Sequence, residues 1–179
     1  LNAGGLVGLP TETVYGLAAR ADIDAAVANI FRAKGRPTGH PLILHIADIS
    51  EIDRYAFNVP SAALTLAQHC WPGPLTLLLH KTNAVSHLVT GGRETVAIRI
   101  PANECSQKII EQCGNALAAP SANLFGHVSP TTAQHVLNDL GDKVDLIVDD
   151  GDCTIGVEST IVDFTTAQPQ LLRPGGFPT

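Results

Sequence analysis

Short apolar runs, each about the length of one strand, recur along the chain and end at Pro, Gly or a polar turn. They predict strands over residues 6–9, 42–46, 75–79, 95–100, 116–119, 146–148, 160–164 and 171–172. The run at 95–100 alternates apolar and polar side chains, which is typical of a strand with one polar face.

Other segments repeat their apolar residues at helical spacing. Ile23, Val27 and Ile30 share one face of a helix that Asp22 or Asp24 can cap and that ends near Lys34-Gly35. Further helices are predicted over 14–19 (capped by Thr11 or Thr13), from a Ser50 and Asp53 capping box, over 62–70 (capped by Ser61), over 103–113 (closed by Gly114), and from Ser129-Pro130 to Gly141.

The order of these elements predicts an α/β fold. Helices and strands mostly alternate, but several strands follow one another directly. A twisted mixed sheet, parallel and antiparallel, flanked by helices fits this order better than a purely parallel sheet. The 179 residues suit one domain, which we expect to cover 1–179.

Composition narrows the class of protein. Hydrophobic residues make up 45%, too many for a disordered chain, and no apolar run approaches the roughly 18 residues of a membrane helix. Without a signal-peptide pattern, we expect a cytoplasmic protein whose four cysteines are buried free thiols, with Cys105 and Cys113 facing the core from one helix. Neither the cysteines nor the seven histidines show a metal-ligand spacing, so no protein-ligated metal is predicted.

The formal net charge of −6 is unevenly distributed. The stretch from residue 139 to residue 152 contains six aspartates and one lysine, so most of the excess negative charge falls there. Together with 4% aromatics, the acidic total argues against a broad nucleic-acid surface. The acidic total is compatible with a single basic pocket, which would be formed by Lys34, Arg36, Arg99 and Arg173.

Polar residues gather where predicted strands end. Thr11 and Thr13 follow the first strand, where they either cap a helix or help its free N–H groups to bind an anion. Arg32, Lys34 and Arg36 fall within five residues, flanked by glycines, and form either a polyphosphate site or a solvated basic loop.

Further polar residues accompany other strands. Arg99 lies inside a strand, where its charge faces solvent or lines a pocket that binds a carboxylate or phosphate. His45, Ser121, Asn123 and Ser159 add a ring nitrogen, hydroxyls and an amide near strand ends. No nucleophile triad or carboxylate pair is evident, so the residues predict a cleft that binds a small polyanion and reacts it by positioning and charge stabilisation.

The order and spacing of six segments resemble the YrdC-like family. These are the segment from Leu9 to Leu17, Lys34-Gly-Arg-Pro37 with Pro41-Leu42, Trp71-Pro-Gly-Pro-Leu-Thr76, Pro120-Ser-Ala-Asn123, Gly156-Val-Glu-Ser-Thr160 and Leu172-Arg-Pro-Gly175. The resemblance implies synthesis of L-threonylcarbamoyl-AMP from L-threonine, bicarbonate or CO₂, and ATP carrying Mg²⁺, with release of pyrophosphate. A partner transferase would then modify an adenosine of tRNA.

The resemblance also implies roles for individual residues. Threonine would be held by Thr13, His45, Arg99, Ser159 and the backbone near Ala119. ATP would be held by Lys34, Arg36, His40, Thr95, Ser121, Asn123, Ser129 and Arg173, of which Lys34 and Arg36 would be catalytic. His40 departs from the family pattern, since many relatives have Asn there.

Two other functions remain open at the level of sequence. The same fold could bind tRNA or double-stranded RNA without making an adenylate, in which case the basic residues would contact a phosphate backbone. A carbamoyltransferase-type relative is the second alternative, although such proteins carry this domain within a much larger chain. A weak tRNA contact is compatible with the main prediction, and no membrane contact is expected.

Overall fold

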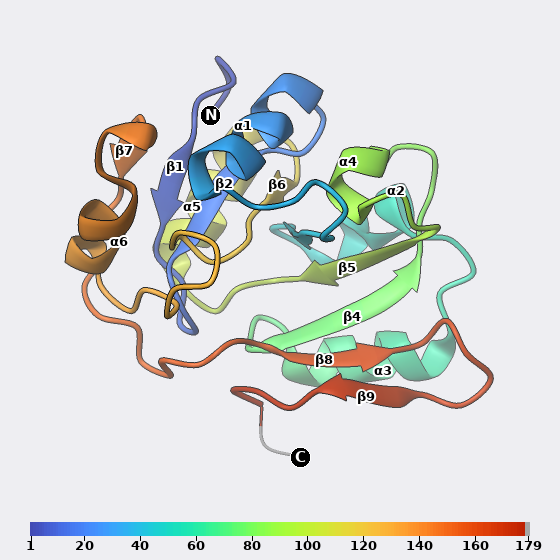
Figure 1. Ribbon diagram of the computed structural model, residues 1–179. Coiled ribbons are helices and arrows are strands. Elements are labelled where there is room, and N and C mark those ends of the chain that lie inside the picture. Colours follow the sequence, from blue (N-terminus) through green and yellow to red (C-terminus); the bar gives the residue numbers. More distant parts are fainter. Residues whose placement is uncertain (178–179) are drawn as a thin grey trace.

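A computed structural model describes residues 1–177 and contains one long mixed sheet (Figure 1). The strand order is β7-β1-β2-β6-β3-β5-β4-β8-β9. The strands are β1 Val7–Leu9, β2 Gly16–Arg20, β3 Ile43–His45, β4 Leu75–His80, β5 Thr95–Arg99, β6 Leu117–Ala118, β7 Leu146–Ile147, β8 Thr160–Asp163 and β9 Gln170–Arg173. Three pairs are parallel (β1 with β7, β3 with β5, β4 with β8) and the others antiparallel, which confirms the predicted mixed sheet.

The predicted helix over 14–19 is wrong. These residues enter β2, which pairs antiparallel with β1 through Val7↔Ala18 and Leu9↔Gly16, and on its other edge with β6. The Thr11 hydroxyl closes the turn by donating to the Val14 carbonyl at 2.6 Å. Because this segment is buried, its backbone needs sheet partners on both edges, and that requirement outweighs a local helical preference.

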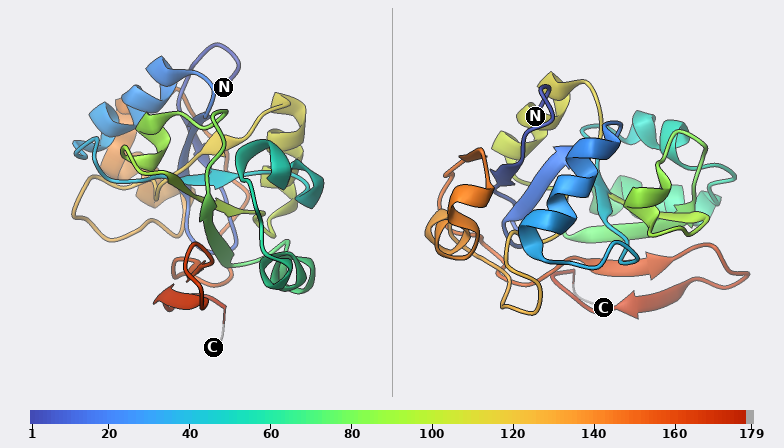
Figure 2. Two further views of the ribbon diagram at one scale, coloured as in Figure 1. Left: turned by 90° about the vertical axis from the view of Figure 1, so that its right-hand side faces the viewer. Right: turned by 45° about the horizontal axis from the view of Figure 1, so that its top comes forward.

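Helices cover both faces of the sheet. In the left view of Figure 2, α1 and α4 lie on one side of the strands and α3 and α5 on the other. The helices are α1 Asp24–Lys34, α2 Ile52–Tyr55, α3 Ser61–Cys70, α4 His87–Thr90, α5 Glu104–Cys113 and α6 Ala133–Leu140, with 3₁₀ turns η1 Ile49–Glu51 and η2 Gly141–Lys143. None of these described helices has both the length and the apolar composition needed to cross a bilayer.

Helix ends were predicted unevenly. Gly35 (φ 62°) and Gly114 (φ 65°) end α1 and α5 as expected, because a residue without Cβ adopts this left-handed conformation at little cost. Ser61 is not a cap: it is the first residue of α3, and Pro60 precedes it. The capping box comprises Asp48 and Glu51 rather than Ser50 and Asp53.

Helix α6 begins three residues after the expected Pro130, with Thr132 as its N-cap. The reason is tertiary: the Pro130 carbonyl accepts from Tyr15 N at 2.8 Å, and the Ser129 hydroxyl donates to Glu158. These contacts hold 129–130 outside the helix.

The core lies between the sheet and its helices. Its largest part includes Tyr15, Leu44, Leu77 and Ile98, and a smaller cluster under α5 joins Leu9 to Ile110. The four cysteines are free, as predicted, but each is partly exposed rather than buried. On α5 it is Ser106 and Ile110 that are buried, and Cys113 packs against the cluster around Ile110 while staying partly exposed.

Candidate active site

A cavity of about 560 Å³ opens where the turn after β1, the 35–41 loop, β5 and the β8–β9 hairpin meet. Nine residues predicted for the site line it: Thr13, Arg36, His45, Thr95, Arg99, Ala119, Ser121, Ser159 and Arg173. Four predicted residues do not line it, namely Lys34, His40, Asn123 and Ser129. The lining also includes Arg93 and Glu158, which the sequence analysis did not single out.

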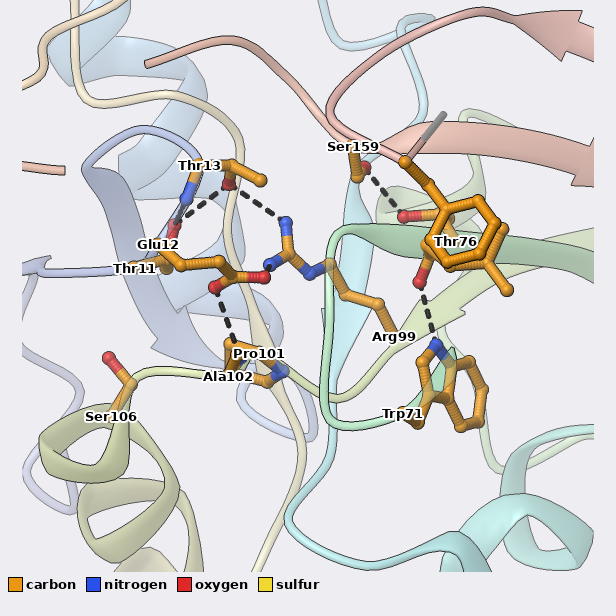
Figure 3. Close-up of polar contacts among 12 residues, drawn as sticks. Thr11, Glu12, Thr13, Trp71, Thr76, Arg99, Pro101, Ala102, Ser106 and Ser159 are labelled. Carbon is orange, nitrogen blue, oxygen red and sulfur yellow. Dashed lines mark hydrogen bonds and ion pairs between the residues drawn. The ribbon is translucent and has the colours of Figure 1, made fainter. Parts of the chain in front are cut away.

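Arg99 lines the buried, deep end of this cavity. Its side chain points toward Glu12 and Thr13 (Figure 3). Its Nη2 lies 2.5 Å from Glu12 Oε1, and its Nη1 donates to the Thr13 hydroxyl at 2.9 Å. Glu12 Oε2 accepts from Ala102 N at 3.1 Å, so both carboxylate oxygens are engaged. A buried guanidinium needs such a partner, because an uncompensated charge is expensive to remove from water. Glu12 therefore explains how a strand interior tolerates an arginine.

His45 is the immediate neighbour of Arg99, because the parallel register of β3 and β5 sets the two residues opposite each other. Burial, and then the charge of Arg99, lower the pKa of His45 to about 3, so the ring is neutral at physiological pH. Its Nδ1 lies 3.2 Å from the Ile43 carbonyl, which can only accept. Nδ1 thus carries the proton, and Nε2 is left as a hydrogen-bond acceptor.

Ser159, which directly precedes β8, contacts side chains of β4 and β9. Its hydroxyl lies 2.7 Å from that of Thr76 on β4 (Figure 3). Arg173 on β9 donates to the Ser159 carbonyl from Nε at 3.0 Å and from Nη2 at 2.8 Å. The backbone carbonyl of Ser159 thus fixes the position of the Arg173 guanidinium.

Glu158 is the carboxylate that lines this part of the cavity. Ser129 Oγ donates to its Oε1 at 2.5 Å, and this hydrogen bond holds the pKa of Glu158 below its ordinary value. Ser129 therefore reaches the cavity through Glu158 rather than by lining it.

Lys34 is not among the residues that line the cavity, and it organises the loop after β6. Its ammonium donates to the carbonyls of Ser121 and Asn123 and lies 3.4 Å from Asn123 Oδ1. Burial, and then the charge of Arg36, lower the pKa of Lys34 to about 8. Lys34 and Asn123 thus fix the backbone that presents Ser121 to the cavity.

Arg36 reaches the cavity from the 35–41 loop. It lies over the ring of Phe125, with its Cζ 5.8 Å from the ring centroid, and its Nη2 donates to the Pro41 carbonyl at 3.3 Å. The exposed His40 packs in an edge-on arrangement with the same ring, with centroids 5.4 Å apart. His40 therefore supports Phe125 rather than facing the cavity.

Sequence reasoning missed Glu12, Arg93 and Phe125. The signal for Glu12 was its place between two polar residues directly after a strand, and for Arg93 its Gly-Gly-Arg turn before another strand. Phe125 had no such signal, because its role depends on the fold bringing 36–40 and 125 together. Residues 1–177 contain no cluster of three or more His, Cys, Asp or Glu placed to hold a metal ion.

A family model described as telomere recombination, which covers the Sua5, YciO and YrdC proteins, matches residues 1–175. The chain belongs to the Sua5/YciO/YrdC family. This confirms the YrdC-like resemblance that the sequence motifs carried.

Among similar members of the Sua5/YciO/YrdC family, threonylcarbamoyl-AMP synthase of Pyrococcus abyssi is 51% identical over 178 residues, covering 99% of this chain and 52% of that protein. The enzyme of the same name from Bacillus subtilis is 51% identical over 96% of this chain and 50% of its own length. The structure of P. abyssi Sua5 complexed with L-threonine matches with a TM-score of 0.97 over 99% of this chain and 52% of that one. The chain spans about half the length of these relatives.

Proposed function

We propose that this chain carries the site where L-threonine, CO₂ or bicarbonate, and ATP combine into L-threonylcarbamoyl-AMP and pyrophosphate. The observation that carries the proposal is one cavity with two chemically different ends. One end holds Thr13, His45 and the Glu12-paired Arg99, the other holds Arg36 and Arg93, and Arg173 lies beside Ser159. A relative 51% identical in sequence binds L-threonine in its crystal.

The deep end suits an amino acid. The Arg99 guanidinium has donors for a carboxylate, while the neutral His45 ring offers an acceptor for an amine. The Ser159 hydroxyl and the backbone at Ala119 line the same region. Because Glu12 already balances the charge of Arg99, this end favours a zwitterion over a multiply charged anion.

The outer end suits the phosphates of ATP. Arg36 and Arg93 line it together with Thr95 and Ser121, and Arg173 and Glu158 line the part beside Ser159, so that the arginines would make a cationic cleft. Lys34, Asn123 and Ser129 would act behind the surface, by holding Ser121 and Glu158, and His40 by holding Phe125. Mg²⁺ would enter on the phosphate oxygens of its substrate, ATP.

The reaction then needs positioning more than protein chemistry. The threonine amine adds to CO₂ and gives a carbamate, whose oxygen attacks the α-phosphorus of ATP as pyrophosphate leaves. Arg36 and Arg173 would stabilise charge on the phosphates, and a protein nucleophile is not needed. The product would pass in the cytoplasm to a transferase that modifies tRNA, with at most a weak tRNA contact by this chain.

The test is to incubate the protein with ATP, Mg²⁺, bicarbonate and labelled threonine, and to measure pyrophosphate and the labelled adenylate. We expect equal amounts of both products, and neither when threonine or bicarbonate is omitted. Arg36→Ala serves as the site control. Absence of threonine-dependent pyrophosphate, together with salt-dependent RNA affinity, would instead favour an RNA-binding module.

A further inference from the structure

The 35–41 loop, which brings Arg36 to the cavity, is held by hydrogen bonds to α4 and to the turn that follows it. Residues 37–41 are all exposed, so burial does not fix their conformation. Hydrogen bonds do: Leu42 N donates to the Val89 carbonyl at 2.7 Å, and Arg93 Nη1 donates to the Gly39 carbonyl at 3.0 Å. The views in Figures 1 and 2 both show the chain after α1 running beside α4 before it enters β3.

One glycine, Gly91, lets these segments touch. A Cβ at residue 91 would lie 2.5 Å from the Gly39 carbonyl oxygen and 2.8 Å from Arg93 Nη1, closer than side-chain atoms approach. Gly91 also has a φ of 60°, a conformation that costs little only without a Cβ. Its neighbour Gly92 has a φ of 81°, but a Cβ there would have no described atom within 4 Å. Gly91 is thus the glycine that the contact with Gly39 requires.

Arg93 bonds its own turn as well as the loop. The same Nη1 lies 3.4 Å from the Thr90 carbonyl and 3.5 Å from that of Gly91. One guanidinium nitrogen therefore links Gly39 to two carbonyls of the 90–91 turn. By contrast, Arg36 itself is held by a single 3.3 Å bond to Pro41 and by the ring of Phe125, so its place depends on where the loop lies.

We propose that Arg93 is a positioning residue for nucleotide binding. By fastening Gly39 to the 90–91 turn, it holds the 35–41 loop so that Arg36 faces the phosphate end of the cavity. The proposal rests on the proposed function for its ligand, a nucleoside triphosphate. Arg93 also lines the cavity, so direct contact with phosphate is the competing role that the experiment must separate.

The first comparison is Arg93→Ala against Arg54→Ala, which removes an exposed arginine from α2, outside the cavity. The Kd for α,β-methylene-ATP is measured by calorimetry, and hydrogen exchange of a peptide covering 35–42 is measured in the ligand-free protein. Arg93→Ala should weaken nucleotide binding about tenfold and speed exchange about fivefold, as expected for the loss of one charged hydrogen-bond network. Arg54→Ala should change neither.

The second comparison is Gly91→Ala against Gly92→Ala. Both place a methyl group on a left-handed residue, but only the first displaces Gly39 while the Arg93 side chain stays present. Gly91→Ala should reproduce the weaker nucleotide binding and the faster exchange of Arg93→Ala, and Gly92→Ala should not. Thermal unfolding of all four variants checks that each is folded.

Three results would overturn the proposal. Weaker nucleotide binding by Arg93→Ala without faster exchange would assign Arg93 to direct phosphate contact. Faster exchange without weaker binding, or equal behaviour of Gly91→Ala and Gly92→Ala, would show that the hydrogen bonds between Arg93 and the loop do not contribute to nucleotide binding.

A different result would test the proposed function instead. If the wild-type protein releases no threonine-dependent pyrophosphate but the binding differences remain, the synthase reaction is rejected and the role of Arg93 is not.

Discussion

The two ends of the cavity hold their cations in opposite ways. Arg99 at the deep end is 3% exposed, lies within a strand and is paired with a carboxylate. Arg36 and Arg93 at the outer end come from loops and bond backbone carbonyls, which leaves their charges unbalanced. A charge deep in a fold requires a counter-charge, whereas a charge near solvent can be kept available for a ligand. We therefore expect Arg99 to orient a ligand through the directions of its hydrogen bonds, and Arg36 and Arg93 to attract a ligand through their charge.

The largest expected effect comes from removing Arg99, the buried cation of the deep end. Arg99→Ala leaves the Glu12 carboxylate buried without its partner, so the free energy of unfolding should fall by about 3–5 kcal/mol. The threonine KM should rise on the order of a hundredfold, because a buried charged donor pair is lost. Urea unfolding and pyrophosphate release at varied threonine concentration measure the two effects.

A double variant separates stability from binding at that end. Arg99→Met combined with Glu12→Gln removes both charges at once, and should recover most of the lost stability without recovering threonine affinity. An unchanged threonine KM in either variant would remove Arg99 from the amino-acid site. Equal stability of single and double variants would contradict the role given to Glu12.

The next effect concerns Lys34, whose pKa falls from the ordinary 10.5 to about 8 on folding. Between these values the unfolded chain holds a proton that the folded protein has released, so the free energy of unfolding rises with pH across that window. The rise should be on the order of 3 kcal/mol, and Lys34→Met should abolish it. Urea unfolding at pH 7.5 and pH 10 gives both slopes.

The control for this titration is Lys108→Met, which removes an exposed lysine from α5 and should keep the wild-type slope. If Lys34→Met also keeps it, the ammonium is not the group that titrates, and its burial has no energetic consequence in this range.

A smaller effect sharpens the outer end. Arg36→Ala should lower the rate of adenylate formation at least about tenfold, because one charged contact with phosphate is lost. The free energy of unfolding should stay within about 0.5 kcal/mol, since the side chain is half-buried on an exposed loop and has no ionic partner within residues 1–177. Near-wild-type turnover would exclude Arg36 from phosphate binding. A large loss of stability would contradict the comparison, because it would show that the fold depends on Arg36 as it depends on Arg99.

The smallest effect is that of the ring beneath Arg36. Phe125→Leu keeps an apolar side chain but removes the aromatic face that lies 5.8 Å from the guanidinium. An exposed cation–π contact contributes about 0.5–1 kcal/mol, so the KM for ATP should rise about two- to fivefold. The threonine KM should not change, and a change in it would show that the two ends are coupled through this loop.

Much of this could be predicted from the sequence, and the failures have physical reasons. Strand and helix identities followed from periodicity in most segments, because β4, β5, α1 and α5 each bury one face or both. The segment 14–19 failed because pairing on both edges, which periodicity does not report, decides its structure.

The site residues also divide into those that the sequence predicts and those that it does not. Residues that line the cavity from strands or strand ends, such as His45, Arg99 and Ser159, were named from sequence together with their family resemblance. The residues that act on them were missed, because Glu12 and Arg93 work through contacts 54 or more positions away along the chain. A pattern within one segment shows that a polar group is present, but not which distant group it serves.

The connectivity of the sheet has a consequence for synthesis of the chain. The hydrogen bond from Leu6 to Asp145 spans 139 positions, and one edge of β4 stays unpaired until β8 is available. The cavity needs Thr13 from the beginning of the chain and Arg173 from near position 175, so a nascent polypeptide on the ribosome has no complete site until almost all of this region has emerged. Until then, the apolar edge of β4 is the surface that a chaperone would need to shield.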